Sequence, residues 1–276
     1  MKFKVKNKIF FTILVTLIVI VLLFPVYWQF IISIRSSAQL NSSDMSLLPK
    51  GIHLENYIYI FSQTKFLNYI LNSFIVSMAT TIISLVIGLF CAYAVARLNI
   101  KGKNFILAFV LSVSIFPGIA LVSPLFVIFK KLSLLNTYWG LILPYITFAL
   151  PLAIWNLQAF FKEIPKEVDE SAKIDGASPF TIFLKIIMPL VTPGIFTTFI
   201  MIFITSWNEF LFGLIFATNG NMRTVPVGII MLQGEYNVPW GQISAASIII
   251  TVPVIVMVMI FQRRIISGIT SGAVKS

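Results

Sequence analysis

The sequence contains few charged residues. Asp, Glu, Lys and Arg make up 11% of its 276 residues, whereas about a quarter of the residues in a soluble domain are charged. Hydrophobic residues make up 58%, and the mean hydropathy is +0.98. A soluble fold of this length could not bury so much apolar surface, so we expect an all-α integral membrane protein with lipid around it. The net charge of +11 is then a topological signal, and we expect no nucleic-acid partner.

Cysteine and histidine are almost absent, with one of each, Cys91 and His53. A lone cysteine cannot form an intrachain disulfide, and we expect Cys91 to be a small packing residue. A metal site needs several converging ligands, so we expect none, and His53 is predicted to be a solvated loop residue.

Two kinds of chemical signature are also missing from the sequence. No G-x-x-x-x-G-K-[ST] segment occurs, so the chain has no phosphate cradle for ATP. No set of nucleophile, base and metal ligands converges either. We therefore expect no catalytic residue and no cofactor on this chain, which is not predicted to be an enzyme.

What the sequence has in abundance is long apolar runs. A helix needs roughly 20 apolar residues to cross a bilayer. Six segments qualify within a single predicted transmembrane domain, 1–276. They are residues 9–34, 69–95, 105–129, 138–161, 186–207 and 243–261.

Basic residues indicate how these spans are oriented. The start, MKFKVKNK, precedes an apolar run that is too long for a signal peptide, so we expect an uncleaved first span with a cytoplasmic N-terminus. Of the 20 Lys and Arg residues, 14 then fall in cytoplasmic segments and 6 in outer segments. Because Lys and Arg collect on the cytoplasmic side, both termini are predicted to be cytoplasmic.

Several of the predicted spans contain proline, which cannot donate the usual helical hydrogen bond. We expect a bundle with bends or kinks rather than straight rods. The prolines concerned are Pro117, Pro144, Pro151, Pro189, Pro193 and Pro253.

Most of the acids gather in one predicted cytoplasmic loop, residues 162–185. Five of the nine Asp and Glu residues lie there: Glu163, Glu167, Asp169, Glu170 and Asp175. Pro165 suits the first turn of a short helix. Ile164, Val168 and Ala172 are spaced by four and predict one apolar stripe. On another face, Asp169 and Lys173 are placed to form an i,i+4 ion pair.

A second short helix is predicted after a turn in this loop. Asp175-Gly176 breaks the first helix because glycine permits a positive φ. Ser178 is a good N-cap and Pro179 a good first-turn residue. A short helix that presents small residues beside charges suits docking in a groove of another protein. A solvated loop that merely keeps its charges out of the membrane fits these residues equally well.

The same loop resembles a known family motif. Glu170-Ser171-Ala172, then Asp175-Gly176-Ala177 and the downstream prolines, is similar to the EAA loop of bacterial ABC importer permeases. Ser171 stands where the family usually has alanine, a small-for-small change. In that family the loop is the coupling helix, which fits into a cleft of a separate ATPase subunit.

The resemblance extends over nearly the whole chain. LLPKGIHLENYIYIF, NSFIVS, SWNEFLFGLIFATN, TVPVGI and SGITSGAVKS resemble carbohydrate-importer permeases in their order and spacing. They are most similar to the smaller permease subunit of the maltose-type systems. This implies a six-helix permease-type bundle with a cytoplasmic coupling helix, in the plasma membrane of a bacterium. The implied partners are a second related permease, a nucleotide-binding ATPase dimer that holds ATP and Mg²⁺, an extracellular substrate-binding protein and a carbohydrate.

The resemblance also implies which residues form sites. The expected ATPase contacts are Glu170, Ser171, Ala172, Asp175, Gly176 and Ala177 in the loop, with Gly272 and Lys275 in the C-terminal tail. Trp207, Asn208 and Glu209 end the fifth span, and they either line the outer mouth of a pathway or meet a binding protein. An interfacial tryptophan anchor beside a polar pair is the alternative there.

Two other functions stay open from the sequence. A stand-alone secondary carrier or pore of six spans would leave the loop as a passive connection. The spans contain almost no ionisable groups apart from Glu209, which is unusual for an ion-coupled carrier. An importer permease for another solute, such as a peptide or phosphate, is the second alternative.

Overall fold

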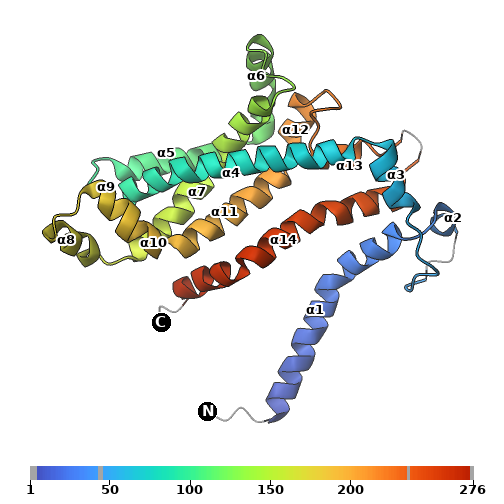
Figure 1. The fold of residues 1–276 in the computed structure, drawn as a ribbon, viewed down its shortest axis with the longest axis horizontal. Coiled ribbons are helices and arrows are strands. Elements are labelled where there is room, and N and C mark those ends of the chain that lie inside the picture. Colours follow the sequence, from blue (N-terminus) through green and yellow to red (C-terminus); the bar gives the residue numbers. More distant parts are fainter. Residues whose placement is uncertain (1–4, 43–45, 235–236, 274–276) are drawn as a thin grey trace. The chain divides into compact units, whose positions relative to one another are not determined.

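The computed structural model describes residues 5–42, 46–234 and 237–273, and within these ranges every regular element is a helix (Figure 1). This confirms the all-α prediction. The chain divides into two compact units. Unit 1 comprises residues 1–66 with 229–252, and unit 2 comprises residues 67–228 with 253–276.

The described residues contain four single helices that are long and apolar enough to cross a membrane, and up to six spans if each of two bent helix pairs counts as one. The single helices are Lys8–Ser33, Phe66–Arg97, Tyr138–Glu163 and Trp240–Gln262. The bent pairs are Lys103–Ile115 with Gly118–Lys131, bent by 89°, and Pro179–Leu190 with Thr192–Trp207, bent by 76°. Together they cover the six predicted ranges.

Proline explains one of the two bends directly. Helix α5 (Lys103–Ile115) ends one residue before Phe116-Pro117, and Pro117 is the N-cap of α6 (Gly118–Lys131). The second bend lies at Val191, between Pro189 and Pro193. In contrast, α7 (Tyr138–Glu163) is continuous through two prolines, and α14 (Trp240–Ala273) is continuous through Pro253.

Unit 1 contains α1 (Val5–Ser33), α2 (Ser37–Leu40), α3 (Glu55–Gln63) and the first part of α14. The exposed side chains of α1 are almost all apolar from Ile9 to Phe24, as lipid-facing positions would be. The buried Asn56 donates hydrogen bonds from Nδ2 to the carbonyl oxygens of Ser33 (3.0 Å) and Arg35 (2.9 Å). A Cβ at Gly241 would lie 2.6 Å from the Asn56 amide, so only glycine fits there.

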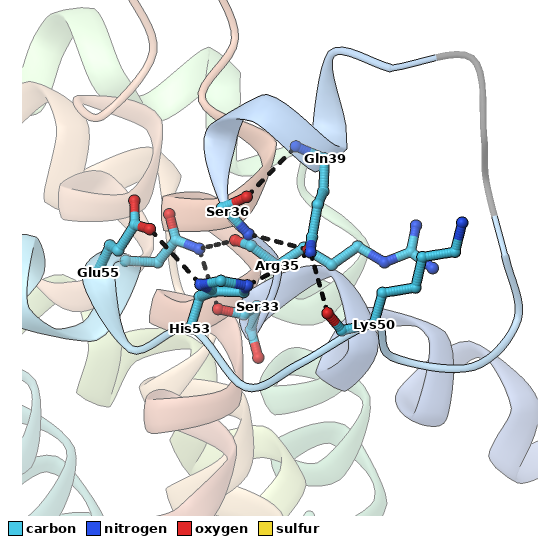
Figure 2. Close-up of polar contacts among 8 residues, drawn as sticks. Ser33, Arg35, Ser36, Gln39, Lys50, His53 and Glu55 are labelled. Atoms are coloured by element: carbon cyan, nitrogen blue, oxygen red, sulfur yellow. Dashed lines mark hydrogen bonds and ion pairs between the residues drawn. The ribbon is translucent and has the colours of Figure 1, made fainter.

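A polar cluster closes the turn between α1 and α3 (Figure 2). Ser36 and Gln39 form a reciprocal capping box at the start of α2. The Gln39 side-chain nitrogen lies 3.3 Å from both the Lys50 carbonyl oxygen and His53 Nε2. His53 Nδ1 is 3.8 Å from Glu55. The His53 side chain is 37% exposed, so the predicted loop histidine is partly solvated and also held by neighbours.

Unit 2 contains the remaining helices. They are α4 (Phe66–Arg97), α5, α6, α7, α8 (Glu167–Ile174), α9 (Pro179–Thr181), the π-helix η1 (Ile182–Ile187), α10 (Met188–Leu190), α11 (Thr192–Trp207), α12 (Leu211–Phe216), most of α13 (Val225–Ile230) and the end of α14.

Small residues let the long helices of unit 2 approach closely. A Cβ at Gly88 of α4 would lie 2.8 Å from that of Ala153 in α7. A Cβ at Gly194 of α11 would lie 2.4 Å from the Phe160 ring of α7. Helix α7 also packs against α5. Close backbone approach through small residues is typical of helix packing in membranes.

Two hydrophobic clusters form the interior of unit 2. The α8-end core contains Leu157, Phe161, Ala172, Phe183 and Ile187, among others. The α12-end core contains Val76, Phe129, Tyr145, Phe212 and Phe216, among others. In Figure 1, α8 and α12 lie at opposite ends of unit 2.

Candidate coupling site

The acid-rich loop folds as the sequence predicts, into two short helices joined by a turn. Helix α7 ends at Glu163 with Ile164 as its C-cap, and α8 follows Pro165 and Lys166. The first turn of α8 holds three acids and its last turn holds Lys173. Acids at the N-terminus and a base at the C-terminus interact favourably with the helix dipole and stabilise α8.

The turn after α8 depends on glycine. Gly176 has φ +79°, and no atom lies within 4 Å of where its Cβ would be. Its conformation, rather than space, therefore selects glycine. Ser178 Oγ then accepts a hydrogen bond from the Thr181 N–H (3.2 Å), with Pro179 in the first turn of α9. The predicted cap is confirmed.

The predicted apolar stripe of α8 faces the chain's own interior. Ala172 is 5% exposed and belongs to the α8-end core, and Ile164 and Val168 pack against that core. Ala172 was expected to contact an ATPase, but its side chain is covered by this chain instead. The reason is helical periodicity, which places Ala172 on the same face as Val168.

The opposite face of the loop is open. Glu170, Ser171, Asp175 and Gly176 are exposed, as expected for a contact surface, and Ala177 is partly buried. Ile174 is 86% exposed, although it was not among the predicted contact residues. A large apolar side chain between charges, held out from the body, is a typical anchor for a partner protein. We call Glu170, Ser171, Ile174, Asp175 and Gly176 the docking face.

A buried arginine attaches α8 to α4. Arg97, the last residue of α4, forms an ion pair with Asp169, and the two side chains are only 4% and 14% exposed. The Arg97 guanidinium also donates to the carbonyl oxygens of Ile164 and Pro165, the latter at 2.9 Å. These two residues directly follow α7, and a longer bond of 3.4 Å reaches the Phe161 carbonyl oxygen in the last turn of that helix, where carbonyls lack helical partners. Arg97 therefore joins α4, α7 and α8.

This ion pair corrects one prediction. Asp169 was expected to pair with Lys173 along the helix, but its carboxylate turns to Arg97 instead. A buried guanidinium offers several donors in a fixed fork, which a flexible, exposed lysine does not match. Arg97 could be recognised in the sequence only as a basic residue at the predicted cytoplasmic end of a span.

At the other end of unit 2, Trp207, Asn208 and Glu209 mark the end of α11. The Trp207 ring is 2% exposed and stacks on Phe203 with centroids 5.6 Å apart, so it is packed inside unit 2. Asn208 is exposed and donates to the Ile204 carbonyl oxygen (2.8 Å). The Glu209 carboxylate accepts from the backbone N–H groups of Phe212 (2.9 Å) and Gly213 (3.1 Å). Of the three, Asn208 and Glu209 are accessible.

Glu209 also lines a cavity of about 370 Å³. The cavity lies where the α5/α6 break, the proline-containing part of α7 and the α11/α12 break meet, because its lining includes Phe116, Phe148, Ser206, Glu209 and Phe212. The Phe148 and Phe212 rings stack with centroids 5.5 Å apart. Broken helices at such places are typical of transporter substrate pathways. We call it the helix-break cavity.

Three further predictions concern the tail, the cysteine and metal binding. Gly272 lies in the last turn of α14, and Lys275 lies outside the described residues. Cys91 is exposed, contrary to its expected packing role. Within residues 5–42, 46–234 and 237–273, no group of three or more His, Cys, Asp or Glu side chains could hold a metal ion.

The architecture matches solved ABC importer permeases. A bacterial ABC transporter involved in the import of the acidic polysaccharide alginate aligns with a TM-score of 0.78 at 20% identity, over 95% of this chain and 99% of that one. The same kind of transporter in complex with an alginate pentasaccharide-bound periplasmic protein aligns with a TM-score of 0.68 at 17% identity, over 94% and 96%. The fold is therefore that of an ABC importer permease.

Sequence comparison gives the family. Residues 84–271 match the binding-protein-dependent transport system inner membrane component family, and the chain belongs to it. The trehalose transport system permease SugB of Mycobacterium tuberculosis is 44% identical, over 98% of each chain. The trehalose/maltose permease MalG of Thermococcus litoralis is 40% identical, over 100% of this chain and 99% of that one. The sulfoquinovosyl glycerol permease SmoH of Agrobacterium fabrum is 40% identical, over 92% and 89%. The chain is thus a multi-pass membrane permease, and its relatives are transport subunits rather than enzymes.

Proposed function

We propose that this chain is one of two related permease subunits of an ATP-driven carbohydrate importer in a bacterial plasma membrane. Its relatives are permeases of transport systems for trehalose, trehalose/maltose and sulfoquinovosyl glycerol, which supports the carbohydrate class. An ATPase dimer on the cytoplasmic side holds ATP and Mg²⁺ and hydrolyses the nucleotide. An extracellular binding protein delivers the sugar, and both termini of this chain are cytoplasmic.

The docking face of α8 is the observation that carries this proposal. It presents Ile174, 86% exposed, between acids on a helix whose other side is fixed in the α8-end core. The ATPase clasps this face, and its closure on ATP moves α8 as a rigid element. Docking of a partner on this face would remove the Ile174 side chain from water, whereas a passive cytoplasmic connection, as in a stand-alone carrier, would leave it exposed.

Site-specific crosslinking tests the docking. Cysteine is placed at Ile174 in a Cys91→Ser background, because Ala172 is buried and Cys91 is exposed. In native membranes with the co-expressed ATPase, we expect an adduct between Ile174→Cys and the ATPase that changes with ATP. Ser62→Cys, an exposed position in the predicted outer segment, is the matched control and forms no such adduct. Absence of the Ile174 adduct would contradict the proposal.

We propose that the sugar passes through the helix-break cavity of this chain. Its volume of about 370 Å³ and its aromatic pair suit a sugar ring, since apolar sugar faces stack on aromatic rings. Ser206 and Glu209 add polar groups at its wall. Phe148→Ala is expected to raise the KM for sugar transport about tenfold. Phe126→Ala, also partly buried against the α12-end core but outside the cavity, is the matched comparison, and equal KM values in the two variants would contradict this route.

A further inference from the structure

Helix α4 differs from the other long helices of unit 2. It runs without proline or interruption from Phe66 to Arg97, whereas α7 contains two prolines and the spans at α5/α6 and α10/α11 are bent. At 1.5 Å per residue it is about 48 Å long, enough to cross the bilayer and emerge on both sides. A continuous helix of this kind resists bending at any single point.

One end of α4 is fixed to the coupling site. Arg97 pairs with Asp169 of α8 and donates to the carbonyl oxygens that follow α7. Tyr93, one turn earlier, packs its ring against Phe161 (5.7 Å) and Phe183 (4.8 Å) of the α8-end core. A displacement of α8 is therefore passed to α4 through both polar and apolar contacts.

The other end of α4 is fixed to the segment 219–228, which is predicted to lie on the outer side. The buried Asn72 donates from Nδ2 to the carbonyl oxygens of Asn221 (2.7 Å) and Arg223 (3.0 Å). Ser73 Oγ accepts from the Val225 N–H (2.8 Å). These bonds join residues about 150 positions apart in the sequence. The segment is thus attached to α4 through its backbone.

We propose that α4 is a strut that couples the segment 219–228 to the coupling helix α8, with Arg97 and Asn72 as the positioning residues at its two ends. This rests on the proposed docking of an ATPase on α8. A movement imposed on α8 by ATP cannot be absorbed at a proline or a break within α4, so it reaches the segment 219–228. If docking of the ATPase on α8 changes the affinity of this segment for a second protein, then binding of that protein changes the affinity of α8 for the ATPase by the same coupling free energy.

The test uses the complete transporter in proteoliposomes: this chain, the second permease, the ATPase and the binding protein. Arg97→Gln and Asn72→Leu are expected to lower the sugar transported per ATP hydrolysed at least tenfold, while the Ile174→Cys adduct with the ATPase persists. Arg97→Lys should recover part of this ratio, because it keeps the charge but not the fork. Exposed Lys103→Gln and Asn68→Leu are the matched controls and keep the normal ratio.

A probe at the outer end measures transmission directly. At Gly220 no atom lies within 4 Å of an added Cβ, so Gly220→Cys can carry a fluorophore without a clash. Its emission should change on ATP addition and should lose most of that change in the Arg97→Gln background. The strut proposal would be overturned if the variants kept the normal ratio of sugar transported to ATP hydrolysed and the normal probe response, with the adduct intact. Loss of the adduct in the otherwise unaltered chain would instead contradict ATPase docking itself.

Discussion

Asp169 and Glu209 are both carboxylates near the ends of unit 2, and they are used in opposite ways. Asp169 pairs with Arg97, 72 positions earlier in the chain, so it joins two helices that the sequence keeps apart. Glu209 accepts from backbone N–H groups only three and four positions later, so it shapes one local turn. The first carboxylate fixes tertiary structure. The second caps a helix and leaves its remaining acceptor capacity toward the helix-break cavity.

The two carboxylates also differ in the stability they are expected to provide. A buried ion pair that loses one partner leaves an uncompensated charge, which costs more than the pair itself contributes. A lost helix cap leaves N–H groups that water or a neighbouring carbonyl can partly satisfy. Four predictions, from the largest expected effect on stability to the smallest, test this difference.

Removing the tertiary carboxylate should have the largest effect. Asp169→Ala leaves the Arg97 guanidinium buried without its counter-ion, and we expect a loss of about 3 to 5 kcal/mol in unfolding free energy. Thermal unfolding of the purified protein in detergent measures it. Glu167→Ala, an exposed acid on the same helix, should change stability by less than about 0.5 kcal/mol. Equal losses of unfolding free energy in the two variants would show that the ion pair of Asp169 with Arg97 does not stabilise the fold.

Removing the local carboxylate should have a smaller and more confined effect. Glu209→Ala deprives two N–H groups of their acceptor, and we expect a loss of about 1 to 2 kcal/mol. Amide hydrogen exchange should accelerate at Phe212 and Gly213 while α8 is unaffected. Glu209→Gln keeps one acceptor oxygen and should show an intermediate rate. Faster exchange in α8 would contradict the local role.

The turn after α8 gives a matched pair of glycines. Gly176 and Gly102 have nearly the same φ, +79° and +80°, and both have open space where a Cβ would be. Replacing either with alanine should cost about 1 kcal/mol, since each forces a left-handed conformation. Only Gly176→Ala should also reduce transport, because it changes the angle between α8 and the helix α9 that follows the turn. Equal transport in both variants would show that the conformation of this turn does not affect coupling.

The docking face should be almost neutral for stability. Ile174→Ser removes a side chain that is 86% exposed, and Ile52→Ser removes one that is 74% exposed. Both should change unfolding free energy by less than about 0.5 kcal/mol. Transport by the importer should fall only in Ile174→Ser. A stability loss that accounts for the reduced transport would mean that Ile174 packs within this chain.

Much of the architecture could be predicted from the sequence because its causes are local. Long apolar runs mark the helices that could span a membrane, Pro117 marks a break, and Gly176, Ser178 and Pro179 set the turn between α8 and α9. Each of these signals acts within a few residues. The EAA-like motif marks the segment that folds as α8 and the turn after it, and its role as a coupling site stays a prediction.

Side-chain orientation and long-range pairing could not be predicted in this way. The Ala172 side chain faces inward, and membership of a motif does not say which face of a helix a partner covers, so its contact with an ATPase stays a prediction. The pairing of Asp169 with Arg97 across 72 positions has no spacing rule that a single sequence reveals. The sequence places Trp207 only at the end of a span, and its stacking on Phe203 inside unit 2 is a packing contact that position in the chain does not reveal.

The π-helix at Ile182–Ile187 has a consequence for how α8 is aimed. Each turn of a π-helix contains more residues than a turn of an α-helix, so removing one residue from this stretch would restore α-helical geometry. The extra residue would be lost within this turn, so the segments on either side would keep nearly the same relative rotation. A deletion in the regular α-helix of α11 has no such compensation, and everything N-terminal to it would rotate by about 100° around the helix axis and shift by about 1.5 Å. The docking face would then point to a different side, with every contact residue still present. The π-turn is therefore a place where the chain can lose a residue and still present the docking face in the same direction.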